Sequence, residues 1–453
     1  MKRPSYRIAI LVFTVFLIPA TGIRLSAEVK FSGELKPEAV FNIPPSSGYG
    51  DTPLNPGNWT DINDLMFRSE INLKLNAQGD TSALDLWFQV KQYPIADLFT
   101  GSAAIAEAMN PGSAGDLSGY SSAVADMFYV VDPYIFTLDI MRASASWMPA
   151  DTLRITFGRQ SFLTGYGYGW NPVDLANPPK DPTDPEAYLR GVDALNIQYS
   201  PASWINTRFY GAVPSQGFTW GYEQILAGAE ITISVPSLEF KLAGLYGGKE
   251  NSSDVYDIYP HAGAAAFYLD VSGIGIYGEG VVRSRSRRNI PAADDNPSII
   301  KEGPVYSALA GLEYYFPSGL VLASEYFYNG EGWDDKERKD YSNSLLDQSN
   351  NGGIVGEYLA LYTPTYFARH YVLMNLMIPW YAIESIFNLN LIWSPDSASI
   401  ILTPNAVFNL NYEGTLTSEI WYSGMFSYND TEKNEAWLAP INHSLWFNLR
   451  YYF

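Results

Sequence analysis

A transmembrane antiparallel β-barrel of about 18 strands is the fold class that this sequence predicts. Three observations predict it. Amphipathic strands recur at a period of two, the connections between them alternate between short and long, and the chain ends on a strand of alternating aromatic residues. After the N-terminal segment no run of about 18 apolar residues occurs, which excludes helical membrane spans. A barrel of about 16 strands remains possible on the same pattern, because strand boundaries are uncertain by a few residues.

The composition favours a barrel wall with one face toward lipid and the other toward water. The chain has 453 residues, of which 47% are hydrophobic, with 33 Tyr, 23 Phe and 12 Trp, yet its mean hydropathy is only -0.09. Side chains that alternate between lipid and water, with aromatic girdles at both interfaces, would give this combination. The absence of cysteine excludes disulfides, thiolate metal sites and a lipid-modified N-terminal cysteine.

The N-terminal segment, residues 1–27, is predicted to be a cleaved signal peptide. Lys2, Arg3 and Arg7 precede an apolar stretch, and small residues at 25–27 offer a cleavage site. The barrel then occupies residues 28–453 as one domain, since no linker or composition shift divides it. Removing the four basic residues of the segment changes the formal net charge from -20 to -24. No nucleic-acid partner is expected.

The clearest strand is LMFRSEINLKLNA at 65–77, where apolar and polar residues alternate. Leu73 is assigned to the lipid face and Asn72 to the lumen face. Leu73→Arg is therefore expected to be costly and Asn72→Arg to be mild. The same alternation predicts strands at 83–92, 400–412 and 415–428.

The connections differ between the two sides of the predicted barrel. Tight turns are predicted at 78–80, 149–151, 200–203, 235–237, 271–273, 317–319 and 412–414. Long polar loops are predicted at about 44–63, 94–134, 161–188, 286–303, 330–365 and 429–441. Short periplasmic turns and longer outer loops are typical of bacterial outer-membrane barrels, and an even strand number returns the last strand to the side of the first. A soluble multi-sheet protein is the alternative.

The chain ends in HSLWFNLRYYF, and Phe447, Leu449, Tyr451 and Phe453 share one face of this strand. The segment resembles the C-terminal signature of outer-membrane barrels. The resemblance implies that the barrel-assembly machinery recognises this strand and that it pairs with the first strand to close the cylinder. Closure would remove an aromatic edge that is otherwise prone to aggregation.

In each strand, the residues that alternate with the apolar ones are predicted to line the lumen. They carry charges of both signs, which in hydrocarbon would cost roughly 2–4 kcal/mol for each Lys or Arg at mid-depth. A water-filled lumen is therefore predicted, in which these charges either brace the wall as ion pairs or set a field across a channel. The candidate lumen-wall residues are Arg68, Glu70, Lys74, Asp85, Lys91, Arg154, Arg208, Glu230, Glu239, Lys241, Glu325, Glu384, Glu419 and Arg450.

The segment 158–199 is the least generic part of the chain. Gly158-Arg159-Gln160 is followed by a Gly/Tyr run and five prolines, and Arg190-Gly191-Val192-Asp193-Ala194-Leu195 begins the next strand. Prolines and Asx positions favour a fixed conformation. The arrangement resembles that of porin-type proteins, alginate-export-like barrels included, and the resemblance implies no particular substrate.

One hypothesis for this segment is an inward fold of residues 161–188 that sets the constriction of a pore. The candidate anchors to the wall are Arg159, Asp174, Arg190 and Asp193. The alternative is an ordered outer lid that does not contact the solute.

No enzyme, cofactor or metal site is expected. The chain has only His261, His370 and His443, none in a recognisable Ser/His/Asp pattern, and it lacks P-loop, G-x-S-x-G and HExxH motifs. The first strand begins too close to the mature N-terminus to leave room for the plug of a TonB-dependent receptor. The polar lumen parity argues against a fatty-acid channel.

The sequence therefore predicts a porin-like outer-membrane channel for passive diffusion of small hydrophilic solutes. Its expected partners are those solutes, outer-membrane lipid, lipopolysaccharide and the assembly machinery. The acidic outer loops are either a solvated surface, a bridge to lipopolysaccharide through divalent cations, or a mouth that favours cations. The alternative function is a surface-exposed barrel whose acidic loops bind a partner, without a transport role. The solute, the direction of transport and the oligomeric state stay open.

Overall fold

The computed structural model covers the chain in several described stretches. They are residues 28–44, 52–54, 62–94, 129–131, 134–177, 179–183, 189–213, 215–216, 219–220, 225–247, 259–290, 299–300, 303–351, 361–428, 434–439 and 441–453. The predicted signal peptide at 1–27 and most of the loop predicted at 94–134 lie outside these residues.

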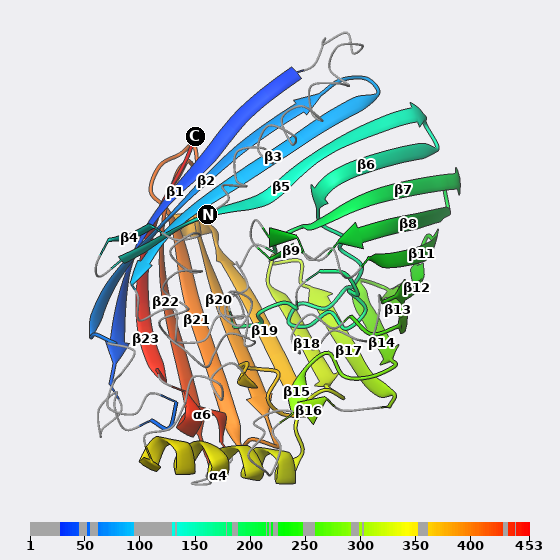
Figure 1. Ribbon diagram of the computed structural model, residues 1–453. Coiled ribbons are helices and arrows are strands. Elements are labelled where there is room, and N and C mark those ends of the chain that lie inside the picture. The colour runs from blue at the N-terminus through cyan, green and yellow to red at the C-terminus, as the bar shows by residue number, and fades with distance from the viewer. Residues whose placement is uncertain are drawn as a thin grey trace, which may run out of the picture.

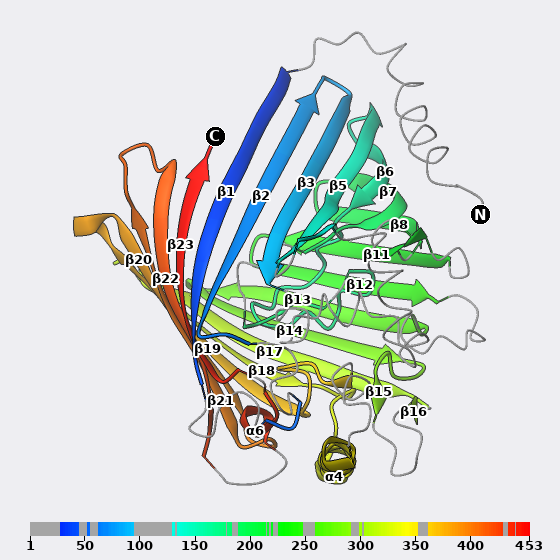
Figure 2. The ribbon, with the colours of Figure 1, turned by 60° about the vertical axis from the view of Figure 1, so that its left-hand side comes forward.

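Eighteen antiparallel strands form a closed barrel, which confirms the predicted fold class and strand number (Figures 1 and 2). Each strand pairs with its neighbour in chain order, and β1 pairs with β23 to close the ring. The strands are β1 (Glu28–Ile43), β2 (Leu65–Gln78), β3 (Ser82–Pro94), β5 (Tyr134–Ala150), β6 (Leu153–Gln160), β7 (Val192–Ala202), β8 (Ile205–Val213), β11 (Leu226–Val235), β12 (Leu238–Tyr246), β13 (Ala262–Val271), β14 (Ile274–Arg283), β17 (Val305–Tyr315), β18 (Val321–Tyr328), β19 (His370–Trp380), β20 (Ser385–Ser394), β21 (Ser399–Asn409), β22 (Leu416–Ser427) and β23 (His443–Tyr452).

The remaining elements are short or lie outside the ring of strands. Helices α4 and α6 lie at the end of the barrel opposite the C-terminus, which we call the outer end (Figures 1 and 2). Among the described residues, no helix has the length and apolar character needed to cross a membrane. These elements are β4 (Tyr129–Val131), β9 (Ser215–Gln216), β10 (Thr219–Trp220), β15 (Asn289–Ile290), β16 (Ile299–Ile300), α4 (Asp335–Asn351), the 3₁₀ turn η6 (Tyr381–Ile383) and α6 (Glu435–Leu438).

Side chains alternate between the two faces of the wall as the period of two requires. In β11, Ile231 and Ile233 are exposed on the outer surface, whereas Glu230, the residue before Ile231, is buried on the inside. Strand β17 alternates in the same way along nearly its whole length. The apolar face of the sheet therefore points outward, toward lipid, and the core of this protein lies inside the barrel.

Strand β2 shows the predicted alternation but corrects one expectation. Asn72 faces inward, yet it is fully buried rather than surrounded by water. Its amide bonds the carboxylates of Glu34 and Glu70, and it accepts hydrogen bonds from Trp87 and Gln89. Asn72→Arg would break this network and bury a new charge, so the expectation that it is mild was wrong.

The last residue of the chain adds two backbone hydrogen bonds to the pairing of β1 with β23 that closes the barrel. The backbone N–H of Gly33 donates to the Phe453 carbonyl at 2.8 Å, and the Phe453 N–H donates to the Gly33 carbonyl at 3.1 Å. A Cβ at position 33 would lie only 2.4 Å from the Phe453 ring, so glycine is needed for this approach. The aromatic side chain of Phe453 also packs beside Phe31 and Tyr451 on the outer surface.

Deleting Phe453 is expected to lower the yield of folded barrel. The deletion removes the two backbone hydrogen bonds to Gly33 together with the aromatic side chain of Phe453. The measurement is the heat-modifiable fraction of the protein in outer membranes on an unheated gel. Phe453→Ala keeps the backbone pair and separates the two contributions. An unchanged yield after deletion would show that this pair is dispensable for closure.

Candidate functional site: an inward loop across the lumen

The segment that follows β6 folds into the barrel. We call its described residues, 161–177 and 179–183, the inward loop. Phe162, Val173 and Leu175 are buried against small inward-facing residues. Trp170 is fully buried and stacks on Phe327 of β18, with ring centroids 5.0 Å apart. The wall residues that pack against Phe162, Val173 and Leu175 lie on strands from β7 to β14. They are Val192, Ala194, Ala212, Leu226, Leu245, Ala264, Ala266 and Val281.

Two glutamates hold the backbone of the inward loop. Glu279 of β14 accepts the N–H groups of residues 166–167, and Glu325 of β18 accepts those of residues 168–169. Both carboxylates are buried. Hydrogen bonds to a charged acceptor contribute about 1.5–3 kcal/mol each when the site excludes water. The four N–H groups are therefore fixed to two neighbouring regions of the wall.

The glycines of the Gly/Tyr run permit this close approach. A Cβ at Gly165 would lie 2.6 Å from a carboxylate oxygen of Glu279, and one at Gly167 would lie 2.0 Å from the Trp170 carbonyl oxygen. Both distances are shorter than atoms tolerate. Gly165 is therefore needed where the loop meets the wall, and Gly167 is needed where the loop backbone folds against its own residue Trp170.

Side chains of the inward loop add a second set of contacts. Thr164 donates to Glu230 at 3.0 Å, and the Tyr166 hydroxyl donates to Glu239 at 2.6 Å. Lys241 in turn donates to the Thr164 carbonyl at 3.1 Å. Burial and the neighbouring carboxylates raise the pKa of the Tyr166 hydroxyl, which therefore stays protonated and remains a donor.

The far end of the inward loop reaches the opposite strands. Lys180 donates to the Gly167 carbonyl at 2.6 Å, and burial lowers the pKa of its ammonium group. Asn390 of β20 donates to the Pro182 carbonyl at 3.1 Å. The described inward loop thus contacts strands from β7 to β20 on the inner side of the barrel.

The four predicted anchors lie at the base of the inward loop and inside it. Arg159 forms a bidentate pair with Asp193, with N–O distances of 3.0 and 2.7 Å, and this pair joins β6 to β7. Asp174 accepts hydrogen bonds from the backbone N–H and the side-chain amide of Asn177, so it shapes a turn within the loop. Arg190 lies half-buried where the chain returns to the wall.

Five of the predicted lumen-wall residues lie behind the inward loop. Glu230, Glu239, Lys241 and Glu325 contact it directly, and Arg208 pairs with Glu230 at 3.3 Å.

Seven others lie on a part of the wall that we call the open wall, the inward face of β1, β2, β3, β22 and β23. Arg450 pairs with Glu419 at 3.0 Å and Lys91 with Glu70 at 4.0 Å. The remaining three are Arg68, Lys74 and Asp85, and the first two lie over the rings of Trp446 and Trp87.

Two predicted wall residues lie elsewhere. Arg154 is exposed near the turn between β5 and β6 and contacts the Met148 sulfur. Glu384 was assigned to the wall wrongly, because it is exposed in the turn after η6 with φ of 48°. Strand β19 ends at Trp380, and the 3₁₀ turn that follows takes Glu384 out of the alternation of the wall.

Comparisons with known proteins identify the fold. No protein-family model matches the chain, and no curated protein matches it. The solved structure of OccAB1 from Acinetobacter baumannii superposes with a TM-score of 0.52 at 8% identity, over 94% of this chain and 96% of that one. The chain has the porin fold. OccK5 (OpdH) and OccK8 (OprE) from Pseudomonas aeruginosa give TM-scores of 0.51 and 0.50 at 8% and 7% identity, each over 94% of this chain and 98% of the other.

Sequence reasoning did not identify the residues that hold the inward loop within this porin fold. Glu279 and Glu325 are ordinary lumen-parity glutamates in the sequence, and nothing local marks them as acceptors for a distant backbone. The alternate glycines of the Gly/Tyr run were the available signal for a close approach. Within the described residues, no group of three His, Cys, Asp or Glu side chains is placed to bind a metal ion.

Asp174 is expected to make the porin fold less stable as pH rises. Burial raises the pKa of its carboxyl from 3.8 to about 6. The folded chain then holds the proton more tightly than the unfolded chain. The contribution of Asp174 to the free energy of unfolding is fully present below about pH 4. It falls by up to about 3 kcal/mol as pH rises through about 6.

The Asp174→Asn variant lacks this titration and serves as the reference. We expect the heat-modification temperature of the wild type, relative to that of the variant, to fall between pH 4 and pH 7. A difference between the two proteins that does not change with pH would contradict the assignment.

Proposed function

We propose that this protein is an outer-membrane channel through which small hydrophilic solutes diffuse passively. In this proposal the inward loop is the constriction and the open wall is the path of the solute. The observation that carries it is the asymmetry of the lumen. The inward loop packs against strands from β7 to β20, whereas most contacts described for the open wall are among its own polar side chains. Near the outer end of the open wall, Ile62 packs against Val40 and Met66. No chemical step is required, because transport is diffusion along a polar surface.

The polar residues of the open wall support a passage for water-soluble molecules. Lys36 pairs with Glu38 at 2.7 Å, and Arg450 lies 3.6 Å from Glu34. These pairs keep opposite charges close together, so the fields of the two charges largely cancel at distances longer than the separation within each pair. We therefore propose solutes that are neutral or carry little net charge.

The proposed setting is the outer membrane of a Gram-negative cell. The signal peptide at 1–27 would direct export, and the aromatic face of β23 would be recognised by the assembly machinery. Outer-membrane lipid and lipopolysaccharide would surround the exposed apolar face of the barrel.

The test is reconstitution of the purified barrel in planar bilayers and in liposomes. We expect stepwise conductance and a swelling rate that falls steeply as neutral sugars increase in size. Swelling that is equally slow for every sugar, together with absent conductance, would favour the alternative of a surface barrel whose acidic loops bind a partner. A heat-modifiable band on the gel confirms that the reconstituted protein is folded in either case.

A further inference from the structure

Outer segments that are distant in sequence meet in one hydrophobic cluster. We call this cluster the outer cap. The rings of Trp333 and Tyr341 in the α4 region are tilted against each other with centroids 4.8 Å apart, and the ring of Phe367, just before β19, lies edge-on 5.0 Å from that of Trp333. The cluster lies at the outer end, beside α4 and α6 (Figures 1 and 2). Its buried members are Leu54, Trp333, Tyr341, Leu345, Leu361, Tyr362, Phe367 and Leu438.

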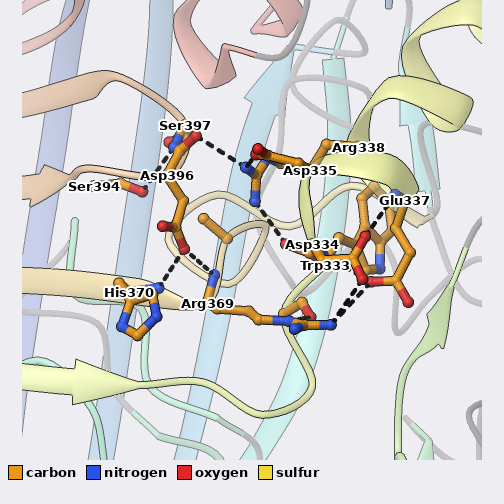
Figure 3. Close-up of polar contacts among 12 residues, drawn as sticks. Trp333, Asp334, Asp335, Glu337, Arg338, Arg369, His370, Ser394, Asp396 and Ser397 are labelled. Atoms are coloured by element: carbon orange, nitrogen blue, oxygen red, sulfur yellow. Dashed lines mark hydrogen bonds and ion pairs between the residues drawn. The ribbon is translucent and has the colours of Figure 1, made fainter.

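Helix α4 is fastened to the barrel rim by charged groups (Figure 3). Asp334 and Glu337 form a reciprocal capping box at its first turn, with N–O distances of 2.9 and 2.7 Å. Arg369 pairs with both carboxylates, at 3.2 and 3.6 Å. The buried Arg338 donates to the backbone carbonyl of Asp396 in the turn between β20 and β21. These contacts hold the outer cap on the rim.

Glu435 of α6 joins the outer cap to the barrel. It is fully buried and accepts from the Thr365 backbone N–H at 3.1 Å. The hydroxyls of Tyr371, Ser397 and Ser399 also donate to it, at 3.3, 3.3 and 3.2 Å. Burial raises the pKa of this carboxyl. A carboxyl buried in this way depends on all of its donors, because each lost hydrogen bond leaves a polar group without water.

Thr365 joins the outer cap to the inward loop. Its N–H binds Glu435, and its carbonyl accepts from the Trp170 ring nitrogen at 3.3 Å. It has φ of 65°, which is unfavourable for a residue with a Cβ, and it is fully buried. A second link runs beside it, since the Tyr366 hydroxyl donates to the Lys180 carbonyl at 2.9 Å.

We propose that the outer cap and the inward loop form one coupled unit, linked through Thr365 and Glu435, so that loosening the cap from outside releases the constriction. This inference rests on the proposed function only for its consequence for transport. The coupling itself is a property of the fold. Because coupling between two elements is reciprocal, a lesion in either element must be felt in the other.

The test is amide hydrogen exchange of the folded, full-length barrel, followed by mass spectrometry of peptides from residues 161–183 and 361–369. Glu435→Ala removes the acceptor of four donors. We expect exchange in residues 161–183 to rise by about tenfold, since their protected amides open with the cap. Trp170→Phe keeps an aromatic ring against Phe327 but removes the N–H donor and part of the buried indole. We expect exchange in residues 361–369 to rise in this variant.

Glu419→Gln is the matched control, because Glu419 is an equally buried carboxylate whose bonds go to Asn405, Asn448 and Arg450. It should leave both peptides unchanged. Exchange that rises only in the mutated element, in either variant, would overturn the coupling. If Glu435→Ala does not assemble, Trp170→Phe alone decides the question. If the protein conducts but exchange in the two elements is not coupled, this inference is wrong. If exchange is coupled but the protein never conducts, the proposed function is wrong.

Discussion

Replacing residues 163–186 by a short Gly/Ser link is expected to raise the single-channel conductance by a factor of about two or more, provided that the barrel assembles. The inward loop packs against the wall from β7 to β20, and an 18-stranded cylinder without it would leave a wider aqueous passage. The measurement is conductance in planar bilayers at 1 M salt or above, where the Debye length is about 3 Å and charge effects are screened.

A smaller change tests the same idea without deleting the segment. In the double variant Glu279→Gln, Glu325→Gln the four backbone N–H groups of the loop lose their carboxylate acceptors. We expect larger current noise and a higher mean conductance, because the inward loop is then held less tightly. Glu419→Gln removes a buried carboxylate from the open wall and controls for charge alone. A deletion variant that assembles and conducts like the wild type would place the constriction elsewhere.

The second large effect concerns the two faces of one strand. Ile231→Arg is expected to destabilise the barrel by roughly 2–4 kcal/mol, because it places a charge against lipid near the middle of β11. Ile231 is 42% exposed on the outer surface. Thr232→Arg, at the next position, points into the lumen beside Glu230, to which Thr232 already donates at 3.3 Å. We expect this variant to be much milder.

Both β11 variants are measured by urea unfolding in lipid vesicles, with the heat-modifiable band as the signal. Ser234→Arg offers a second lumen position on the same strand. Equal losses at 231 and 232 would mean that this part of β11 does not separate lipid from water, and the assignment of faces would then have to be revised.

The barrel could be predicted from the sequence because its signal is local. A strand that separates two solvents repeats every two residues, so a window such as 65–77 carries the information by itself. The same alternation did not predict that Asn72, although it faces inward, is fully buried. Parity gives the direction of a side chain but not its neighbours, and Glu34 and Gln89 come from the two flanking strands. Parity also placed Glu384 on the lumen wall, where the geometry of a short turn decides the outcome.

The position of the inward loop could not be predicted for a different reason. Its holding groups are far away in the chain: Glu279 lies 113 residues from Tyr166, and Glu325 lies 157 residues from Tyr168. Only closure of the barrel brings those strands to the same side of the lumen. The proline content indicated a fixed shape, and the alternate glycines were an unused signal for a close approach. Neither indicated which strands would be contacted, nor that Trp170 would meet Thr365.

The way in which Glu279 and Glu325 hold the inward loop has an evolutionary consequence. They bind main-chain N–H groups, which every residue except proline provides, and not the side chains of residues 166–169. The two tyrosines can therefore be exchanged by mutation without removing these four bonds, as long as the glycines remain. The hydroxyl contacts are different, because Tyr166 donates to Glu239 and Tyr168 to Glu313. A lineage could therefore vary these two positions and keep the backbone support, while each change removes one hydroxyl contact with the wall.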